Sequence, residues 1–207
     1  MIKRNAVETK YRILRTAEKI FSKVGFDAAR VDDIAKEAGV NKALIYYYFK
    51  SKDEILDMLF NSLIDDAKQL LIKSFESPMD ISLEDNYRPL FKKYIDFVTR
   101  KREIIKIAIA ESTKASPKVS VVMKLGDLLV NAEIESIRKV HRDKGLCFPN
   151  TDEQEKLVME FFTGLMPFFC FALYKNEWQN FYNISEEDLY EKFYQAFKKT
   201  HLAAHMK

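Results

Sequence analysis

The chain has 207 residues, which is enough for one large domain or for a small and a medium one. Its 47% hydrophobic and 13% aromatic residues exclude a disordered chain, and only 5 glycines and 5 prolines argue against an all-β fold, which needs many tight turns. The net charge of +3 is unevenly placed, because residues 1–52 hold 12 lysines and arginines against 6 acidic residues, whereas the remainder holds 22 against 25. This asymmetry indicates an anionic partner for the N-terminal end, with a merely solvated charged face as the alternative.

The predicted elements are all helices, so the expected fold is all-α with about nine of them. Helical spacing of apolar residues recurs along the whole chain, and Ser51-x-x-Glu54 has the pattern of a capping box. The expected helices cover approximately residues 8–24, 31–38, 42–49, 51–75, 87–100, 104–110, 117–145, 151–176 and 185–201. The predicted division is an N-terminal domain of residues 1–52 and a larger domain of residues 53–207.

Residues 31–52, VDDIAKEAGVNKALIYYYFKSK, predict a helix-turn-helix unit. Such a unit needs a small residue in its first helix and a turn residue that tolerates positive φ about four positions later, and Ala35 and Gly39 have that spacing. Asn41 is expected to cap the second helix through its side-chain oxygen. The apolar residues expected to face inward are Ile34, Ala38, Val40, Ile45 and, in part, Tyr48.

The second helix of this unit carries side chains suited to DNA. Lys42 can donate to guanine O6 and N7, and Ala43 can touch a thymine methyl group. The hydroxyls of neighbouring tyrosines and the surrounding lysines can contact phosphates. A helical hairpin with an exposed aromatic turn is the alternative, but the apolar set, the cap and the clustered lysines together favour DNA binding.

The stretch IAKEAGVNKALIYYYFKSKDEIL resembles the signature of the tetracycline-repressor (TetR/AcrR) family of bacterial transcriptional regulators. The upstream AEKIFSKVGFDAARVDD is similar to that family's first helix and loop, so the resemblance covers about residues 11–59. It implies a three-helix DNA-binding domain, a larger ligand-binding and dimerising domain, and a homodimer that binds a palindromic operator, usually as a repressor, until a small molecule releases it.

The resemblance also implies roles for individual residues. Lys42 and Ala43 match positions that contact bases, and Asn41 stands where Ser is common. Where the family often has a threonine that caps its second helix, this chain reads Ala29-Arg30-Val31, so Arg30 is expected to replace the phosphate contact while the cap is lost. Four further residues match positions near the phosphate backbone, namely Tyr46, Tyr47, Tyr48 and Lys52.

The larger domain is expected to hold an aromatic-lined pocket between helices for an effector of unknown identity. Ordinary core packing is the alternative for any single aromatic residue. An acidic residue among apolar ones, such as Glu160, would favour a lipophilic cation. The candidate pocket residues are Phe91, Tyr94, Glu111, Met123, Phe161, Phe162, Met166 and Phe169.

Dimerisation is assigned, as the resemblance implies, to the last two long helices, where Gly164 and Ala172 could admit a second copy. Two other classes of function remain. A DNA-binding protein controlled by a protein partner would have a filled core and no effector. An enzyme is not expected, because no Ser/His/Asp order, paired catalytic acids or glycine-rich phosphate loop is present.

Neither a cofactor nor a metal nor a membrane is expected. Cys147 and Cys170 lack C-x-x-C spacing and predict reduced thiols in a cytoplasmic protein. The histidines, His141, His201 and His205, have no metal-ligand spacing with them. The N-terminus lacks the apolar run of a signal peptide. Residues 161–174 form the longest apolar stretch, of about 14 residues, which predicts a buried helix kinked at Pro167 and too short to span a bilayer.

Overall fold

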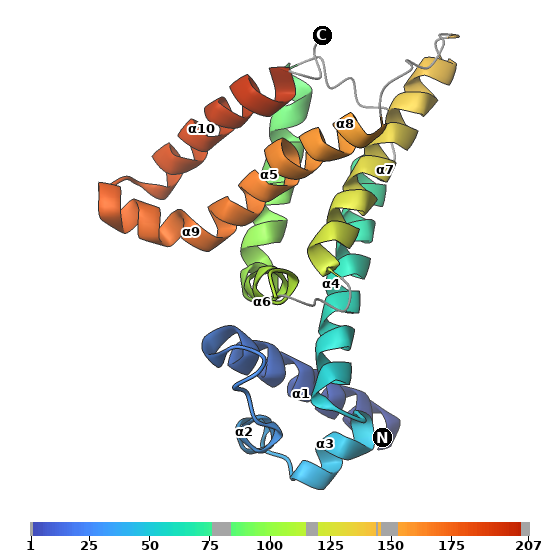
Figure 1. Cartoon of the computed structure of the whole chain (residues 1–207), viewed down its shortest axis with the longest axis vertical. Coiled ribbons are helices and arrows are strands. Elements are labelled where there is room, and N and C mark those ends of the chain that lie inside the picture. The colour runs from blue at the N-terminus through green and yellow to red at the C-terminus, as the bar shows by residue number, and fades with distance from the viewer. Residues whose placement is uncertain (1, 76–83, 115–119, 144, 146–152, 204–207) are drawn as a thin grey trace. The chain divides into compact units, whose positions relative to one another are not determined.

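The computed structural model describes residues 2–75, 84–114, 120–143, 145 and 153–203, and within these ranges the chain is helical with no strand (Figure 1). The helices form nine continuous runs in the described residues, so the all-α prediction is confirmed. Some predicted features lie outside the described residues, namely the first residues of the helices expected over 117–145 and 151–176, Cys147 and His205.

The first four helices are α1 (Ile2–Val24), α2 (Val31–Ala38), α3 (Lys42–Tyr48) and α4 (Lys52–Phe75). The middle of the chain forms α5 (Glu84–Arg100), α6 (Arg102–Ser112) and α7 (Val121–Asp143). One run then joins α8 (Glu153–Met159), the π-helix η1 (Glu160–Leu165) and α9 (Met166–Tyr182), and the last run joins α10 (Glu186–Phe197) to the π-helix η2 (Lys198–Leu202).

By packing, the chain divides into a first unit of Met1–Asp66 and Glu103–Val122 and a second unit of Ala67–Arg102 and Met123–Lys207. Each unit has its own apolar core. The predicted functional boundary between residues 52 and 53 stays a prediction, because compactness does not say which residues bind DNA. Helix α4 does begin beside that boundary, at Lys52.

The first unit is built around α1, whose apolar side contacts α2 and residues of α6. Ile13 and Phe21 of α1 are almost completely buried, as is Ile105 of α6. The Ser22 hydroxyl donates to the Glu103 carboxylate, and Lys106 Nζ donates to the Ser22 carbonyl at 2.9 Å. The beginning of α6 is therefore attached to α1 through polar contacts at Ser22.

The second unit has an aromatic core where α5, α9 and α10 meet. Phe91 of α5 is fully buried, and its ring centroid lies 5.0 to 5.6 Å from those of five other rings. At the edge of this core, Arg88 makes two hydrogen bonds to Glu191, at 2.7 and 3.0 Å, and lies over the Tyr194 ring. The five rings around Phe91 are those of Phe168, Tyr190, Phe193, Tyr194 and Phe197.

A π-helical turn precedes the proline that the sequence analysis expected to kink its helix. Pro167 has no N–H to donate, and the wider turn η1 lies immediately before it, at the beginning of α9. Within η1, Glu160 is buried, and Gly164 leaves room for His201, whose Cε1 would lie 2.9 Å from an added Cβ. The expectation that Gly164 admits a second copy is therefore wrong, because the chain's own imidazole fills that space.

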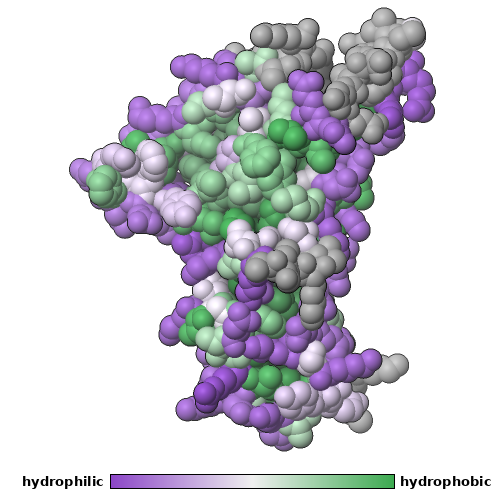
Figure 2. Space-filling view, viewed as in Figure 1, coloured by the Kyte–Doolittle hydropathy of each residue, from purple (hydrophilic) through white to green (hydrophobic). Residues whose placement is uncertain are grey.

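The apolar run of α8, η1 and α9 is longer and more exposed than the sequence suggested. It ends at Tyr182, not near Asn176, because Asn183 adopts a left-handed φ of 48°. The described chain contains one helix long and apolar enough to cross a membrane, Gln154–Tyr182, yet only 28% of its most apolar window is buried. The prediction that this segment is too short to span a bilayer is therefore wrong for the described helix, although the core helix of a soluble protein passes the same test. Ala172 is fully buried within the unit, but much of the run's apolar surface is exposed, as Figure 2 shows over this segment.

Gly39 ends α2 with a φ of 64°, and its replacement by valine is expected to destabilise the first unit. An added Cβ would touch nothing within 4 Å, so the cost comes from backbone strain alone, on the order of 1–2 kcal/mol. Urea denaturation followed by circular dichroism measures this loss. Gly39→Asn is the control, because asparagine tolerates this conformation better and should lose less. An unchanged urea midpoint for Gly39→Val would contradict the requirement for a left-handed backbone at this position.

Candidate nucleic-acid interface

The turn between α2 and α3 is fixed by backbone hydrogen bonds that only a left-handed residue allows. The N–H of Gly39 bonds to the carbonyl of Lys36, and the N–H of Val40 bonds to that of Ala35 at 3.0 Å, which is the arrangement of a Schellman motif. Ala35 is buried beneath the turn, as predicted from its spacing to Gly39. The turn therefore ends α2 abruptly and redirects the chain into α3.

Local capping then starts the next two helices. The Asn41 side chain accepts from the N–H of Leu44 at 2.8 Å, which confirms the predicted cap of α3. Ser51 accepts from the N–H of Glu54, whose own carboxylate accepts from the N–H of Lys50. The predicted Ser-x-x-Glu cap is thus present, although the glutamate reaches Lys50 instead of the capping serine. Arg30 precedes α2 without any side-chain cap, as expected from the absence of threonine.

Burial separates the two faces of the α2–α3 pair. Ile34, Ala38 and Ile45 are buried, and Val40 and Tyr48 are half-buried, so the predicted inward face is confirmed. The opposite face is exposed, with Tyr47 at 78% and Tyr46 at 49% of their full accessibility. Of the eight residues predicted to contact DNA, six are exposed, namely Arg30, Asn41, Lys42, Ala43, Tyr46 and Tyr47.

An open groove of about 560 Å³ lies beside the N-terminal end of α3. It brings together four of the predicted residues, whereas Asn41, Ala43, Tyr47 and Tyr48 are not among its lining residues. Its lining consists of Ala29, Arg30, Val31, Asp32, Lys42, Tyr46, Lys50, Ser51 and Lys52. The described lining of the groove is predominantly cationic, with Arg30, Lys42, Lys50 and Lys52 against Asp32.

Lys42 is paired within this groove. Its ammonium lies 2.9 Å from Asp32 Oδ1 and 3.0 Å from Oδ2, and the hydrogen bond from Lys42 to Asp32 raises the pKa of the lysine. Asp32 was not among the predicted site residues. The sequence signal that could have found it is an acidic residue in the first turn of α2, ten positions before the lysine that begins α3.

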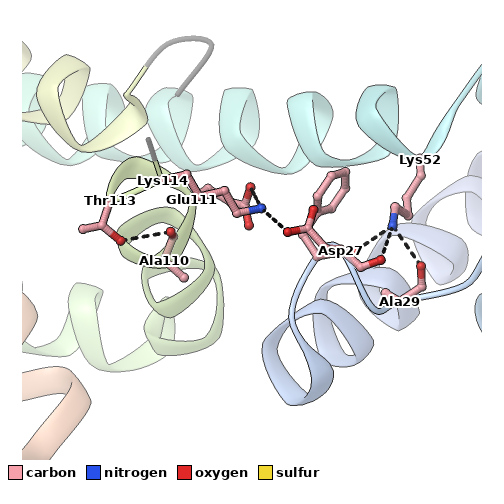
Figure 3. A network of polar contacts seen from close by, with 8 residues as sticks. Asp27, Ala29, Lys52, Ala110, Glu111, Thr113 and Lys114 are labelled. Atoms are coloured by element: carbon pink, nitrogen blue, oxygen red, sulfur yellow. Dashed lines mark hydrogen bonds and ion pairs between the residues drawn. The ribbon is translucent and has the colours of Figure 1, made fainter. Parts of the chain in front are cut away.

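Lys52, at the start of α4, is hydrogen-bonded to the backbone of the α1–α2 connection (Figure 3). Its ammonium donates to the carbonyls of Phe26, Asp27 and Ala29 at 2.6, 3.2 and 2.9 Å and lies 4.5 Å from the centre of the Phe26 ring. The predicted phosphate contact of Lys52 stays a prediction. In this structure the same side chain fixes the segment that leads into α2.

The same connection is held by the end of α6 (Figure 3). Lys114 Nζ lies 2.7 Å from Asp27 Oδ2 and 2.7 Å from Glu111 Oε2. The hydrogen bond from Lys114 lowers the pKa of Asp27, and the two carboxylates raise the pKa of Lys114. Sequence analysis missed this network, because the two partners of Lys114 come from segments more than eighty residues apart.

The residues predicted to line an effector pocket are only partly brought together. Phe91 and Phe169 are buried core residues, whereas Phe162 is 64% and Met123 is 57% exposed. Glu111 belongs to the first unit and is paired with Lys114, while the other seven belong to the second. Within the second unit, Tyr94 and Phe168 make an edge-to-face contact, and Phe161 and Phe162 another. Phe161 and Met166 are half-buried.

Two short helices joined by a left-handed glycine turn, with the second presenting basic and aromatic side chains, define a helix-turn-helix domain. Residues 13–59 match the model of the bacterial regulatory proteins of the tetR family. Residues 13–59 therefore form a DNA-binding domain of the tetR-family type, which confirms the resemblance seen over residues 11–59.

Two curated relatives each match less than half of this chain. An uncharacterized HTH-type transcriptional regulator of Bacillus subtilis (strain 168), YhgD, is 35% identical over 86 residues, which cover 42% of this chain and 44% of that protein. IcaR, the negative regulator of the biofilm operon icaADBC in Staphylococcus aureus (strain Newman), is 30% identical over 91 residues. These residues cover 44% of this chain and 48% of IcaR. The chain thus matches about half the length of these relatives.

Solved structures share the fold over nearly the whole chain. A fatty acid degradation regulator, FadR from Bacillus halodurans, is 18% identical with a TM-score of 0.65 and covers 91% of this chain and 94% of its own. A putative TetR-family regulator from Syntrophomonas wolfei is 15% identical with a TM-score of 0.67 and coverages of 92% and 93%. FadR from Bacillus subtilis in complex with stearoyl-CoA is 16% identical with a TM-score of 0.64 and coverages of 90% and 96%.

Replacing Lys52 with methionine is expected to lower the stability of the first unit by about 1–2 kcal/mol, because three backbone carbonyls lose a charged donor and solvent replaces it only in part. Urea denaturation followed by circular dichroism is the measurement. Lys50→Met is the matched control, since Lys50 is exposed and only two positions away. Equal stability of the two variants would contradict the structural role of Lys52.

Proposed function

We propose that this chain is a DNA-binding transcriptional regulator, acting most simply as a repressor that binds a palindromic operator as a homodimer. The observation that carries this proposal is the exposed face of α3, where Lys42, Tyr46 and Tyr47 follow the Gly39 turn within a tetR-family domain. IcaR is a negative regulator, which supports repression as the direction of control. The operator lies in the cytoplasm, where such a protein acts.

In this proposal the N-terminal end of α3 enters the major groove. Lys42 donates to guanine, and Ala43 lies against a thymine methyl group. Phosphate contacts come from Arg30 and from the exposed tyrosines. Phosphate contacts set the register of the protein on the duplex, whereas Lys42 and Ala43 supply the sequence preference.

A homodimer is supported by an apolar face that the second unit leaves exposed. Exposed aromatic side chains recur with helical spacing on α9, and Trp178 and Tyr182 contact each other with ring centroids 4.7 Å apart. One short recognition helix contacts few bases, so two half-sites about one helical turn apart multiply the discrimination. The exposed apolar residues of this run are Leu157, Val158, Phe162, Tyr174, Trp178, Phe181 and Tyr182.

The proposed effector is a small hydrophobic or aromatic molecule that binds the second unit. FadR from Bacillus subtilis binds stearoyl-CoA in the same fold, which supports the capacity of this architecture for apolar effectors. The effector would shift a two-state dimer only by its differential affinity for the two states. The fully buried Phe91 instead favours a second possibility, in which the aromatic core is filled and a protein partner controls DNA binding.

The two kinds of control are distinguished by a thermal-shift screen of acyl-CoAs, free fatty acids and aromatic cations. An effector should raise the melting temperature and release the operator, because it binds the folded chain. A screen in which no compound does both would contradict the small-molecule proposal and leave control by a partner.

DNA binding is tested by selecting fragments of the source genome with the purified protein and then measuring the affinity of variants for the selected site. Lys42→Ala and Tyr47→Ala should each weaken binding about tenfold or more without unfolding, since each removes an exposed contact. Lys93→Ala is the control, because it removes an exposed lysine from α5. Unchanged affinity in both α3 variants would overturn the assignment.

Dimerisation is tested with Trp178→Glu and Phe162→Glu, each of which places a charge on the exposed apolar face. Both should convert a dimer into a monomer in analytical ultracentrifugation, because an unpaired charge is costly in a desolvated interface. Tyr11→Glu is the control, since Tyr11 of α1 is 65% exposed but lies outside this face. A dimer that survives both substitutions would contradict the proposed interface.

A further inference from the structure

The pair formed by Lys42 and Asp32 joins the two helices that a DNA-reading unit must present together. Asp32 lies in the first turn of α2, and Lys42 is the first residue of α3. Both oxygens of the carboxylate lie within 3.0 Å of the ammonium, so the lysine is held at the mouth of the groove. An ammonium has three N–H donors, so it can bind this carboxylate and still donate toward a ligand.

Asp32 is an acidic side chain among the cationic side chains of the groove. Among the described residues that line the groove, four carry cationic side chains, Arg30, Lys42, Lys50 and Lys52, and Asp32 is the one acidic member. A carboxylate at this place repels phosphate and cancels the charge of the lysine that it holds. For a surface that binds DNA by charge alone, Asp32 is therefore unfavourable.

We propose that Asp32 is a positioning residue that sets sequence specificity, by directing the Lys42 ammonium toward a base edge and lowering its attraction to phosphates. The inference rests on the proposed DNA-binding function. A guanine offers two acceptors, O6 and N7, to the remaining donors of an ammonium fixed in one place. A lysine without this carboxylate would act as a mobile point charge that binds any phosphate within reach.

Removing Asp32 should change the affinity for operator DNA and for non-specific DNA by different amounts. Non-specific binding depends on the number of phosphates neutralised, so removing Asp32 should strengthen it and steepen its salt dependence by about one unit of slope per subunit. The affinity for the operator should rise less than the affinity for non-specific DNA, or should fall, because the Lys42 ammonium is no longer held in one direction. The ratio of specific to non-specific affinity should therefore fall about tenfold.

Asp33 provides a matched control. It is the next residue in the same first turn, it is exposed, and it is not among the residues that line the groove. Asp33→Asn removes the same charge from the same helix terminus, so it reproduces any loss of favourable interaction with the helix dipole. A difference between the two variants then reports on the pairing with Lys42.

The experiment measures fluorescence anisotropy of the full-length wild type, Asp32→Asn and Asp33→Asn with the operator selected by the wild type and with a shuffled duplex, at several salt concentrations. Operators with each base substituted in turn test the preference for guanine. We expect only Asp32→Asn to lower the affinity ratio and to relax one guanine position. In a Lys42→Met background the same change should leave the ratio nearly unaltered, because the side chain through which Asp32 acts is absent.

Equal ratios for Asp32→Asn and wild type, or the same fall for Asp33→Asn, would overturn this inference while leaving the DNA-binding function intact. A wild-type protein that selects no DNA would instead defeat the proposed function itself. Circular dichroism checks that each variant is folded. If Asp32→Asn does not fold, Asp32→Ser removes the carboxylate with a residue suited to the beginning of a helix, and the same two ratios decide.

Discussion

The left-handed backbone at Gly39 is the constraint on which the candidate interface depends. Its φ of 64° allows the N–H groups of residues 39 and 40 to close the last turn of α2, and Asn41 can then begin α3 at once. With so short a connection, Ile34 and Ile45 are both buried on one side. Lys42 and Tyr47 are consequently left on the other side, where a DNA duplex can reach them.

Several of the positive side chains in the first unit are fixed by hydrogen bonds and ion pairs, which the composition does not reveal. Three cations of the first unit have partners within it, Lys42 with Asp32, Lys52 with backbone carbonyls and Lys114 with Asp27. Such pairs between exposed groups contribute little to stability, but they fix where each positive charge is. The positive charges of Lys42, Lys52 and Lys114 are therefore held in defined places by their partners.

The second unit uses one helical run for two purposes. Its inward side supplies Phe168, Phe169 and Ala172 to the aromatic core around Phe91, while its outward side leaves Phe162 and Trp178 exposed. The π-helix η1 contains Phe162, and its Gly164 leaves room for the His201 imidazole. The exposed apolar residues on its outer side are the basis for the proposed dimer contact.

The sequence by itself determined the helices, the turn and the exposed face of α3. These features depend on residues close together in the chain, such as the Gly39 turn, the Asn41 and Ser51 caps and the apolar spacing of α2. Only the tertiary structure decided that Asp32 pairs with Lys42 and that Lys52 and Lys114 bind the segment around Asp27. It also decided that Gly164 leaves room for His201. Such contacts join different helices, and their partners depend on how those helices pack, which local propensity and periodicity do not specify.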